Sequence, residues 1–179
     1  MKKIPNLFKR NFETFKIYDE ITEGCEWALK EGMATRKYDG TACLVLGGAL
    51  FKRFDCKKDR ALPIEGFCCE DEPDPITGHW PWWIPITLND KCHREAFTGV
   101  EGEGTYELYG PKINGNPEEL ATHELIPHGV IKYPQCPRSF NGIREFLIKE
   151  EIEGIVWYWD NGEMCKVKLK DYGIKRRQL

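Results

Sequence analysis

Short runs of alternating apolar and polar residues recur along this chain, and turn-forming residues separate them. This alternation predicts β-strands at 33–38, 41–47, 49–54 and 104–110. Gly47-Gly48 is expected to form a hairpin turn between the second and third of these strands. A second hairpin is predicted where "EGIVWYW" and "EMCKVKLK" flank Asp160-Asn161-Gly162.

Helical periodicity is clearest in "PRSFNGIREFLIKEEI", where Ile143, Phe146 and Leu147 fall on one face of an amphipathic helix. A shorter helix is expected over Cys25–Glu31, closed by Gly32, and another short helical turn over 90–97.

The proline- and tryptophan-rich segment 61–87 is expected to be an ordered loop, because proline disfavours both a regular helix and a central strand. Its residues His79, Trp80, Trp82 and Trp83 could offer stacking surfaces to the bases of a single-stranded nucleic acid. We favour the alternative, in which the aromatic rings pin the loop to the core.

Composition predicts one domain spanning residues 1–179, since 41% of the residues are hydrophobic and the length is typical of a single domain. The formal net charge of −3 lacks the basic excess of non-specific nucleic-acid binders, so a polyanion site has to be local. We find no apolar run of 18 or more residues and no leader-like apolar segment after "MKK". A monomer in the cytoplasm is expected, in the host cytoplasm if the source is a virus, without membrane contact or secretion.

Eight cysteines are scattered along the chain without a C-x-x-C pair. Because a chain of this size folds without disulfides, reduced thiols are the favoured interpretation, ahead of a structural zinc site.

Three lysines alternate with apolar residues in "CKVKLKDYG", and on a strand Lys166, Lys168 and Lys170 would point to one face. Such a face is often simply solvated. Glu153, which opens the partner strand, could instead lie beside these lysines and orient a metal ion or a ribose hydroxyl, or form a cross-strand ion pair.

Lys37 lies at the end of a predicted strand, before the Asp39-Gly40 turn of "RKYDGTACLV". A lysine becomes a nucleophile when burial or neighbouring cations lower its pKa, and Arg53, Lys168 and Lys170 are candidate neighbours.

Five elements in order resemble the motifs of the covalent nucleotidyltransferases, the superfamily of polynucleotide ligases and RNA capping enzymes. They are "KYDG" with Lys37, "FKRFD" with Arg53, "YELYG" with Glu107, "EGIV" with Glu153, and "KVKLK" with Lys168 and Lys170. Within the superfamily, "PDPITGHWPWW", "HREAF", "YELYGPKINGNPE" and "EGIVW" are most similar to the vertebrate-type RNA ligase 1 group. The resemblance extends over nearly the whole chain.

This resemblance implies an α+β fold, a nucleotidyltransferase (ligase adenylation) domain of antiparallel sheets with flanking helices. It implies an ATP-dependent ligase that joins a 5′-phosphate to a 3′-hydroxyl in RNA and serves RNA repair, with Mg²⁺ or Mn²⁺ as cofactor. Lys37 would carry AMP; Asp39 would contact the lysine or the nucleotide, and Arg53 the AMP or the RNA 5′-phosphate. Glu107 would hold the ribose, Glu153 would bind the metal with Asp39 as a further candidate ligand, and Lys168 and Lys170 would contact the α-phosphate.

Several features are left open by the resemblance. Lys166 could contact RNA, and Tyr109 or Trp157 could stack on adenine, although a core role is equally consistent for both aromatic residues. Since only nine residues follow Lys170, we expect no OB-fold domain. The basic tail Lys175, Arg176 and Arg177 could touch phosphates or only solubilise the C-terminus. A DNA ligase, a GTP-dependent capping guanylyltransferase and a non-catalytic RNA-end-binding module are the alternative functions.

Overall fold

The computed structural model describes residues 3–57, 61–75 and 77–176, and divides the chain into two compact units. Unit 1 comprises Met1–Lys3 and Asp39–His128, and unit 2 comprises Ile4–Tyr38 and Gly129–Leu179. The paired strands are antiparallel in both units, and helices accompany the sheets, so the coarse α+β prediction is confirmed. The organisation of residues 1–179 as one nucleotidyltransferase domain stays a prediction.

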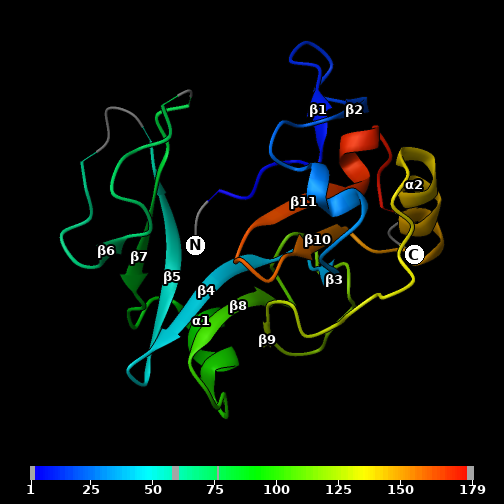
Figure 1. Cartoon of the computed structure of the whole chain (residues 1–179). Coiled ribbons are helices and arrows are strands. Elements are labelled where there is room, and N and C mark those ends of the chain that lie inside the picture. The colour runs from blue at the N-terminus through cyan, green and yellow to red at the C-terminus, as the bar shows by residue number, and fades with distance from the viewer. Residues whose placement is uncertain (1–2, 58–60, 76, 177–179) are drawn as a thin grey trace. The chain divides into compact units, whose positions relative to one another are not determined.

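Unit 1 is built on a six-stranded sheet in the order β6-β7-β5-β4-β8-β9 (Figure 1). Its strands are β4 (Thr41–Leu46), β5 (Ala49–Cys56), β6 (Phe67–Cys68), β7 (Trp80–Pro85), β8 (Gly104–Tyr109) and β9 (Glu124–Pro127), and its helix is α1 (Lys91–Phe97). Gly47 and Gly48 both adopt positive φ in the turn between β4 and β5, as the sequence predicted.

One face of the unit 1 sheet forms a hydrophobic core, because alternate residues of neighbouring strands point to the same side. Cys43 and Val45 of β4 pack there with Tyr106 and Leu108 of β8, together with Ala96 from α1. The intervening positions, which face the other side, carry polar residues discussed below.

The prediction of a loop throughout 61–87 is wrong for residues 67–68, which form the edge strand β6, and for residues 80–85, which form strand β7 inside the sheet. The carbonyl of Pro81 accepts a hydrogen bond from Cys69 N on the β6 side, whereas Ile86 N donates to Leu50 O on the β5 side. The backbone N–H and C=O groups of successive strand residues point to alternate neighbouring strands. Pro81 and Pro85, which lack an N–H group, occupy positions that point away from β5 and toward the two-residue strand β6. The prolines therefore remove no bond from the long pairing of β7 with β5.

Aromatic pinning of this segment is confirmed for Trp83, which is buried. The indole N–H of Trp80 donates to Glu70 O (2.7 Å), and the rings of Trp80 and Trp82 pack edge to face.

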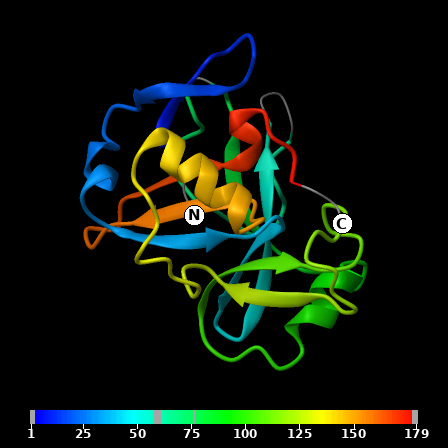
Figure 2. The same cartoon turned by 90° about the vertical axis from the view of Figure 1, so that its right-hand side faces the viewer.

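Unit 2 is built on the three-stranded sheet β11-β10-β3 and the hairpin of β1 with β2. Its elements are β1 (Phe8–Arg10), β2 (Ile17–Ile21), β3 (Met33–Lys37), α2 (Phe140–Lys149), β10 (Gly154–Tyr158), β11 (Met164–Lys168) and two 3₁₀ helices, η1 (Glu26–Leu29) and η2 (Leu169–Tyr172). Figure 2 shows α2 lying over the three-stranded sheet.

Helix α2 is the amphipathic helix that the periodicity predicted. The Ser139 side chain accepts a hydrogen bond from Gly142 N at its first turn, a common N-terminal cap. Ile143 and Leu147 are fully buried against Ile155 and Trp157 of β10. This packing covers one face of the three-stranded sheet and leaves the other face for the polar residues of β3 and β11.

Several further elements differ from the prediction. The helix expected over Cys25–Glu31 is reduced to one turn of 3₁₀ helix that ends at Leu29 with Lys30 as its C-cap, and Gly32, with φ of +73°, lies beyond it. The strands β1, β2 and β9 were not predicted.

All eight cysteines are free thiols, and among the described residues no helix is long and apolar enough to cross a membrane.

Candidate functional site

Lys37 ends β3, and its ammonium group forms an ion pair with the carboxylate of Glu153, Nζ to Oε2 2.5 Å. Nζ also donates a hydrogen bond to Tyr38 O (3.1 Å). The Lys37 side chain is 24% exposed and that of Glu153 is 9% exposed, so the pair is partly shielded from water. The sequence predicted each residue as functional, and the structure brings the two together within unit 2.

Strand register places Lys168 in the same row as Lys37. Gly154 of β10 pairs with Lys37 of β3 on one side and with Lys168 of β11 on the other. Directly opposed residues of antiparallel strands point to the same face, so both lysines lie on one face with only a glycine between them. A Cβ on Gly154 would lie 2.3 Å from Val167 O, so the close approach of β10 and β11 requires glycine here.

Lys166 shares this face, because it lies two residues before Lys168 on the same strand. Lys170 does not. Strand β11 ends at Lys168, and Lys170 lies exposed in η2, where Leu169 and Asp171 are buried. The prediction that all three lysines lie on one strand face is therefore wrong for Lys170.

Burial and mutual repulsion shift the pKa values of the strand lysines. Burial lowers the pKa of Lys166 to about 8, and the positive charges of Lys168 and Lys37 add to this effect. Burial also lowers the pKa of Lys168; the positive charges of Lys170 and Lys37 add to this effect, whereas Asp171 and Glu153 oppose it. These effects indicate that the lysine side chains share one electrostatic environment, which an anion would stabilise.

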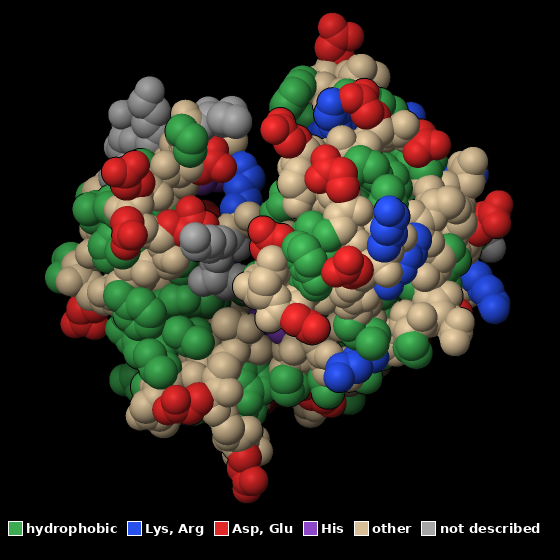
Figure 3. Space-filling model, in the orientation of Figure 1, with side chains coloured by type: hydrophobic (Ala, Val, Ile, Leu, Met, Phe, Trp, Pro, Cys, Tyr) green, Lys and Arg blue, Asp and Glu red, His purple; other side chains and the backbone are tan. Residues whose placement is uncertain are grey.

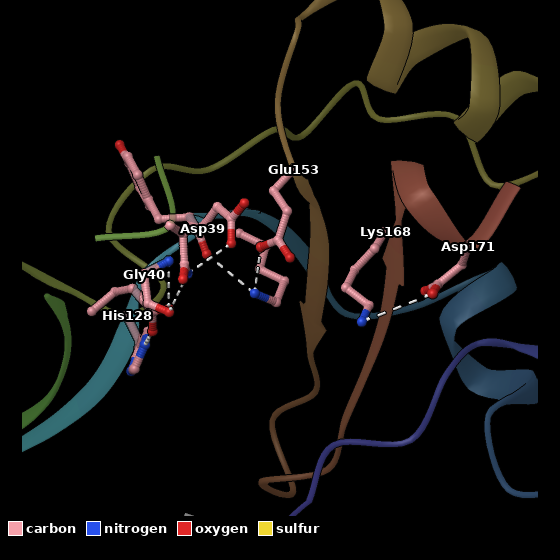
Figure 4. Close-up of polar contacts among 10 residues, drawn as sticks. Asp39, Gly40, His128, Glu153, Lys168 and Asp171 are labelled. Atoms are coloured by element: carbon pink, nitrogen blue, oxygen red, sulfur yellow. Dashed lines mark hydrogen bonds and ion pairs between the residues drawn. The ribbon is translucent and has the colours of Figure 1, made fainter. Parts of the chain in front are cut away.

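The sheet face that carries Lys37, Lys166 and Lys168 is called the lysine face below. Asp171 contacts Lys168 of this face. Its carboxylate is only 4% exposed, lies 2.5 Å from the Arg10 guanidinium and is 3.8 Å from Lys168 Nζ (Figure 4). Neither Arg10 nor Asp171 was a candidate from the sequence. Their ion pair ties β1 to η2 and fixes the chain immediately after Lys168.

Unit 1 carries the remaining predicted residues, and two of them share the polar face of its sheet. Ala42 of β4 pairs with Glu107 of β8. On the other side of β4, Cys43 pairs with Lys52 of β5, so one residue further along this antiparallel pair Ala42 lies opposite Arg53. Arg53 and Glu107 therefore lie in one row, separated by a small residue. The guanidinium of Arg53 is paired with Asp55 (3.0 Å), and Arg53 lies opposite Trp83 on β7.

Asp39 and Gly40 form the turn at the start of unit 1. Asn114 Nδ2 donates to Asp39 Oδ1 and to Gly40 O, both at 3.0 Å. Gly40 N donates to Glu107 Oε1 (3.1 Å), and the other oxygen of Glu107 lies 2.8 Å from His128 Nε2. Sequence reasoning missed both residues: Asn114 lies within the stretch "YELYGPKINGNPE" but was given no role there, and His128 lies outside every quoted motif.

The candidate adenine-stacking residues lie in different environments. Trp157 is fully buried in the unit 2 core, on the face opposite Lys37, so it is not available for stacking. Tyr109 is mostly buried, and its hydroxyl donates to Glu124 Oε2 (3.2 Å). In the predicted basic tail, Lys175 is exposed and Arg176 donates to Glu151 O, whereas Arg177 lies outside the described residues.

No group of three or more metal-ligating side chains occurs within the described residues. Basic side chains are interspersed with acidic ones on the molecular face in Figure 3 rather than gathered in one broad patch. On this face, the mixture of charges agrees with the low formal net charge of the chain.

Fold and site together define an α+β protein that presents a lysine–carboxylate pair next to further lysines on one sheet face. A family model described as RNA ligase 1 matches residues 98–178. An RNA ligase 1 of Danio rerio is 30% identical over 136 residues, which cover 55% of this chain and 42% of the relative. An RNA ligase 1 of Rattus norvegicus is 29% identical in an alignment 250 positions long. This alignment covers 93% of this chain and 76% of the relative.

A third relative, an RNA ligase 1 of Pongo abelii, is 29% identical over 156 residues, with 64% of this chain and 46% of the relative covered. The matches thus span between 42% and 76% of the lengths of these three relatives. They relate the chain to the RNA ligase 1 group and confirm the relationship that its motifs predicted.

Proposed function

We propose that this protein is an ATP-dependent RNA ligase that joins a 5′-phosphate to a 3′-hydroxyl through a covalent lysyl-AMP intermediate, and that it serves in RNA repair. One observation carries the proposal: Lys37 forms an ion pair with Glu153 and lies in one row with Lys168 across Gly154. The relationship to proteins named RNA ligase 1 supports RNA as the substrate. A nucleotidyltransferase fold is part of the same proposal.

In the first step, Lys37 Nζ attacks the α-phosphorus of ATP, a phosphorus–nitrogen bond forms, and pyrophosphate leaves. Since the ion pair with Glu153 holds Nζ as an ammonium ion, Lys37 has to pass a proton to the Glu153 carboxylate or to water before it attacks. Lys168 and Lys166 would neutralise the phosphate oxygens as charge builds up in the transition state. Their shared strand face favours Lys166 over Lys170 for this role.

In the later steps, AMP passes to the RNA 5′-phosphate, and the 3′-hydroxyl then attacks that phosphate and releases AMP. Arg53 is proposed to contact the AMP or the RNA 5′-phosphate, and Glu107 is proposed to hold the ribose. Both oxygens of Glu107 already contact protein groups, so a ribose hydroxyl would use the remaining lone pairs.

Glu153 is proposed to hold Mg²⁺ or Mn²⁺, and Asp39 stays the further ligand that the resemblance implies. Mg²⁺ is commonly bound by one or two carboxylates together with substrate phosphates, so Glu153 and the phosphates of ATP would together supply such ligands. When bound, the cation would supply positive charge to the leaving pyrophosphate.

Intact-mass measurement after incubation with ATP and Mg²⁺ tests the proposal. The wild-type protein should gain one AMP, Lys37→Met should gain none, and the matched control Lys149→Met, at the exposed end of α2, should gain AMP normally. A GMP adduct formed from GTP would indicate a capping guanylyltransferase, and preferential sealing of nicked DNA would indicate a DNA ligase. RNA binding without any adduct, in protein that also arrives without AMP, would refute the ligase proposal in favour of an RNA-end-binding module.

A further inference from the structure

Two side chains of unit 1, those of Asn114 and Glu107, hold the Asp39-Gly40 turn; Figure 4 labels the turn and His128. The single amide group of Asn114 donates both to Asp39 Oδ1 and to Gly40 O. Glu107 accepts from Gly40 N through Oε1 and contacts His128 Nε2 through Oε2. Because a carboxylate only accepts hydrogen bonds, the His128 Nε2–H is the donor in that contact.

Close packing already fixes the backbone of Gly40. A Cβ at this position would lie 2.2 Å from Leu108 O and 2.7 Å from the Glu107 Cγ, so the turn lies directly on β8. This packing does not set the direction of the Asp39 side chain. Asp39 lies two residues after Lys37 in the chain. Asn114 supplies that constraint through its bond to Asp39 Oδ1.

The loop that carries Asn114 is strained in a way that suits this task. Lys112, Asn114, Asn116 and Glu119 all have positive φ, a conformation that side chains other than asparagine rarely adopt. Asn116 closes the loop, since its side chain accepts from Leu120 N and donates to Leu120 O. Strained backbone of this kind persists only where surrounding contacts enforce it, and it clusters at functional sites.

We propose that Asn114 and His128 are positioning residues for lysyl-AMP formation, which hold Asp39 and the Asp39-Gly40 turn in the orientation that the reaction requires. Asn114 acts directly on Asp39, and His128 acts through Glu107. This inference rests on the proposed ligase function, because its catalytic readout is the AMP adduct on Lys37.

The test compares variants that remove one donor each. Asn114→Gly keeps the positive-φ conformation but removes the amide, and Asn114→Asp keeps the shape but replaces the donor by a second carboxylate. His128→Phe removes the donor while keeping a ring, and His128→Gln restores an N–H. The matched control is Asn116→Gly, the same change in the same loop at a residue that touches neither Asp39 nor Gly40.

We expect single-turnover AMP transfer to Lys37 at saturating ATP to slow by about tenfold to a hundredfold in Asn114→Gly and His128→Phe, and further in Asn114→Asp. His128→Gln should recover most of the rate, and Asn116→Gly should stay within about threefold of the wild type. Rates unchanged in both Asn114 variants, or an equal loss in Asn116→Gly, would overturn the proposal.

Hydrogen exchange of the Gly40 amide separates this inference from the ligase proposal, because it needs no nucleotide. Exchange should become about fivefold faster or more in Asn114→Gly and His128→Phe, and remain unchanged in Asn116→Gly. If the wild-type protein forms no AMP adduct, the ligase proposal fails, and accelerated exchange then shows only a structural clamp, which overturns the catalytic positioning role. An unchanged Gly40 exchange rate overturns the clamp itself.

Discussion

Replacing Gly154 by alanine should displace the lysine face without changing a single charged group. The new Cβ would lie 2.3 Å from Val167 O and 3.0 Å from the Lys168 Cα. An ordinary contact between carbon and oxygen needs about 1 Å more than the first of these distances, since non-bonded atoms pack at roughly 3.5 Å. Strand β11 therefore has to move away from β10 by about 1 Å at the row that holds Lys37 and Lys168.

Two consequences follow from this displacement. Forced overpacking of a well-packed sheet costs about 1–3 kcal/mol of unfolding free energy, which urea denaturation would measure. A shift of about 1 Å in the groups around a reaction can lower its rate roughly a hundredfold, so AMP transfer to Lys37 should slow by about that factor. The rate is measured by intact mass in a single turnover, at a temperature where the variant stays folded.

Gly162→Ala is the matched control, in the turn of the same hairpin. Its φ is +88°, so alanine there is also strained, but a Cβ would meet no atom within 4 Å. We expect a stability loss of about 1 kcal/mol with nearly unchanged AMP transfer. The reasoning is refuted if folded Gly154→Ala reacts at the wild-type rate, or if Gly162→Ala loses as much activity.

Three further predictions concern the lysine face and the residues behind it. Lys166→Met should slow lysyl-AMP formation by about tenfold or more, whereas Lys170→Met should slow it by less than about threefold. The reason is that only Lys166 shares the strand face with Lys168, and equal losses in the mass assay would contradict it. Because burial lowers the pKa of Lys166 to about 8, the wild-type rate should fall as pH rises through about 8, and Lys166→Arg, which stays charged, should lack that fall in a pH–rate profile. The unfolded chain keeps the Lys166 proton up to its ordinary pKa of about 10.5, so urea unfolding should show stability rising with pH between about 8 and 10.5, less steeply in Lys166→Met. Asp171→Asn should lower the unfolding free energy by about 3 kcal/mol, because it leaves the Arg10 charge without its buried partner; a loss below about 1 kcal/mol in urea denaturation would argue against a stabilising role for the pair.

The elements that could be predicted from the sequence are those specified by local chemistry. Gly47-Gly48 and Asn161-Gly162 impose the backbone conformations that tight hairpins need, whatever the rest of the chain does. Helix α2 follows from apolar spacing and the Ser139 cap, both contained within a few residues. Lys37 and Glu153 were both predicted as site residues because they lie in recognisable motifs, but their ion pair with each other was not predicted.

The features that were missed depend on partners distant in the sequence. Proline normally excludes a central strand, and β7 escapes that rule only because its proline residues face the short strand β6. Strand β2, "IYDEI", has three exposed positions in five and lacks the apolar pattern of a core strand. Asn114 reaches a residue 75 positions earlier, so no pattern within its own loop indicated the contact.

The assignment of the phosphate-binding lysines shows how tertiary contacts resolve a pattern that is ambiguous in sequence. "KVKLK" contains two overlapping K-x-K pairs, and alternation alone treats Lys166, Lys168 and Lys170 as equivalent. Strand β11 ends at Lys168, and the chain continues directly into η2. In η2, Leu169 is buried and Asp171 forms an ion pair with Arg10, and these two contacts hold the chain in the 3₁₀ helix. Because Arg10 lies 161 residues from Asp171, the end of the strand is set by a contact that the motif does not contain. The pair that remains on the strand with Lys37 in the same sheet is Lys166 and Lys168, and this is the pair that we expect to act on the α-phosphate.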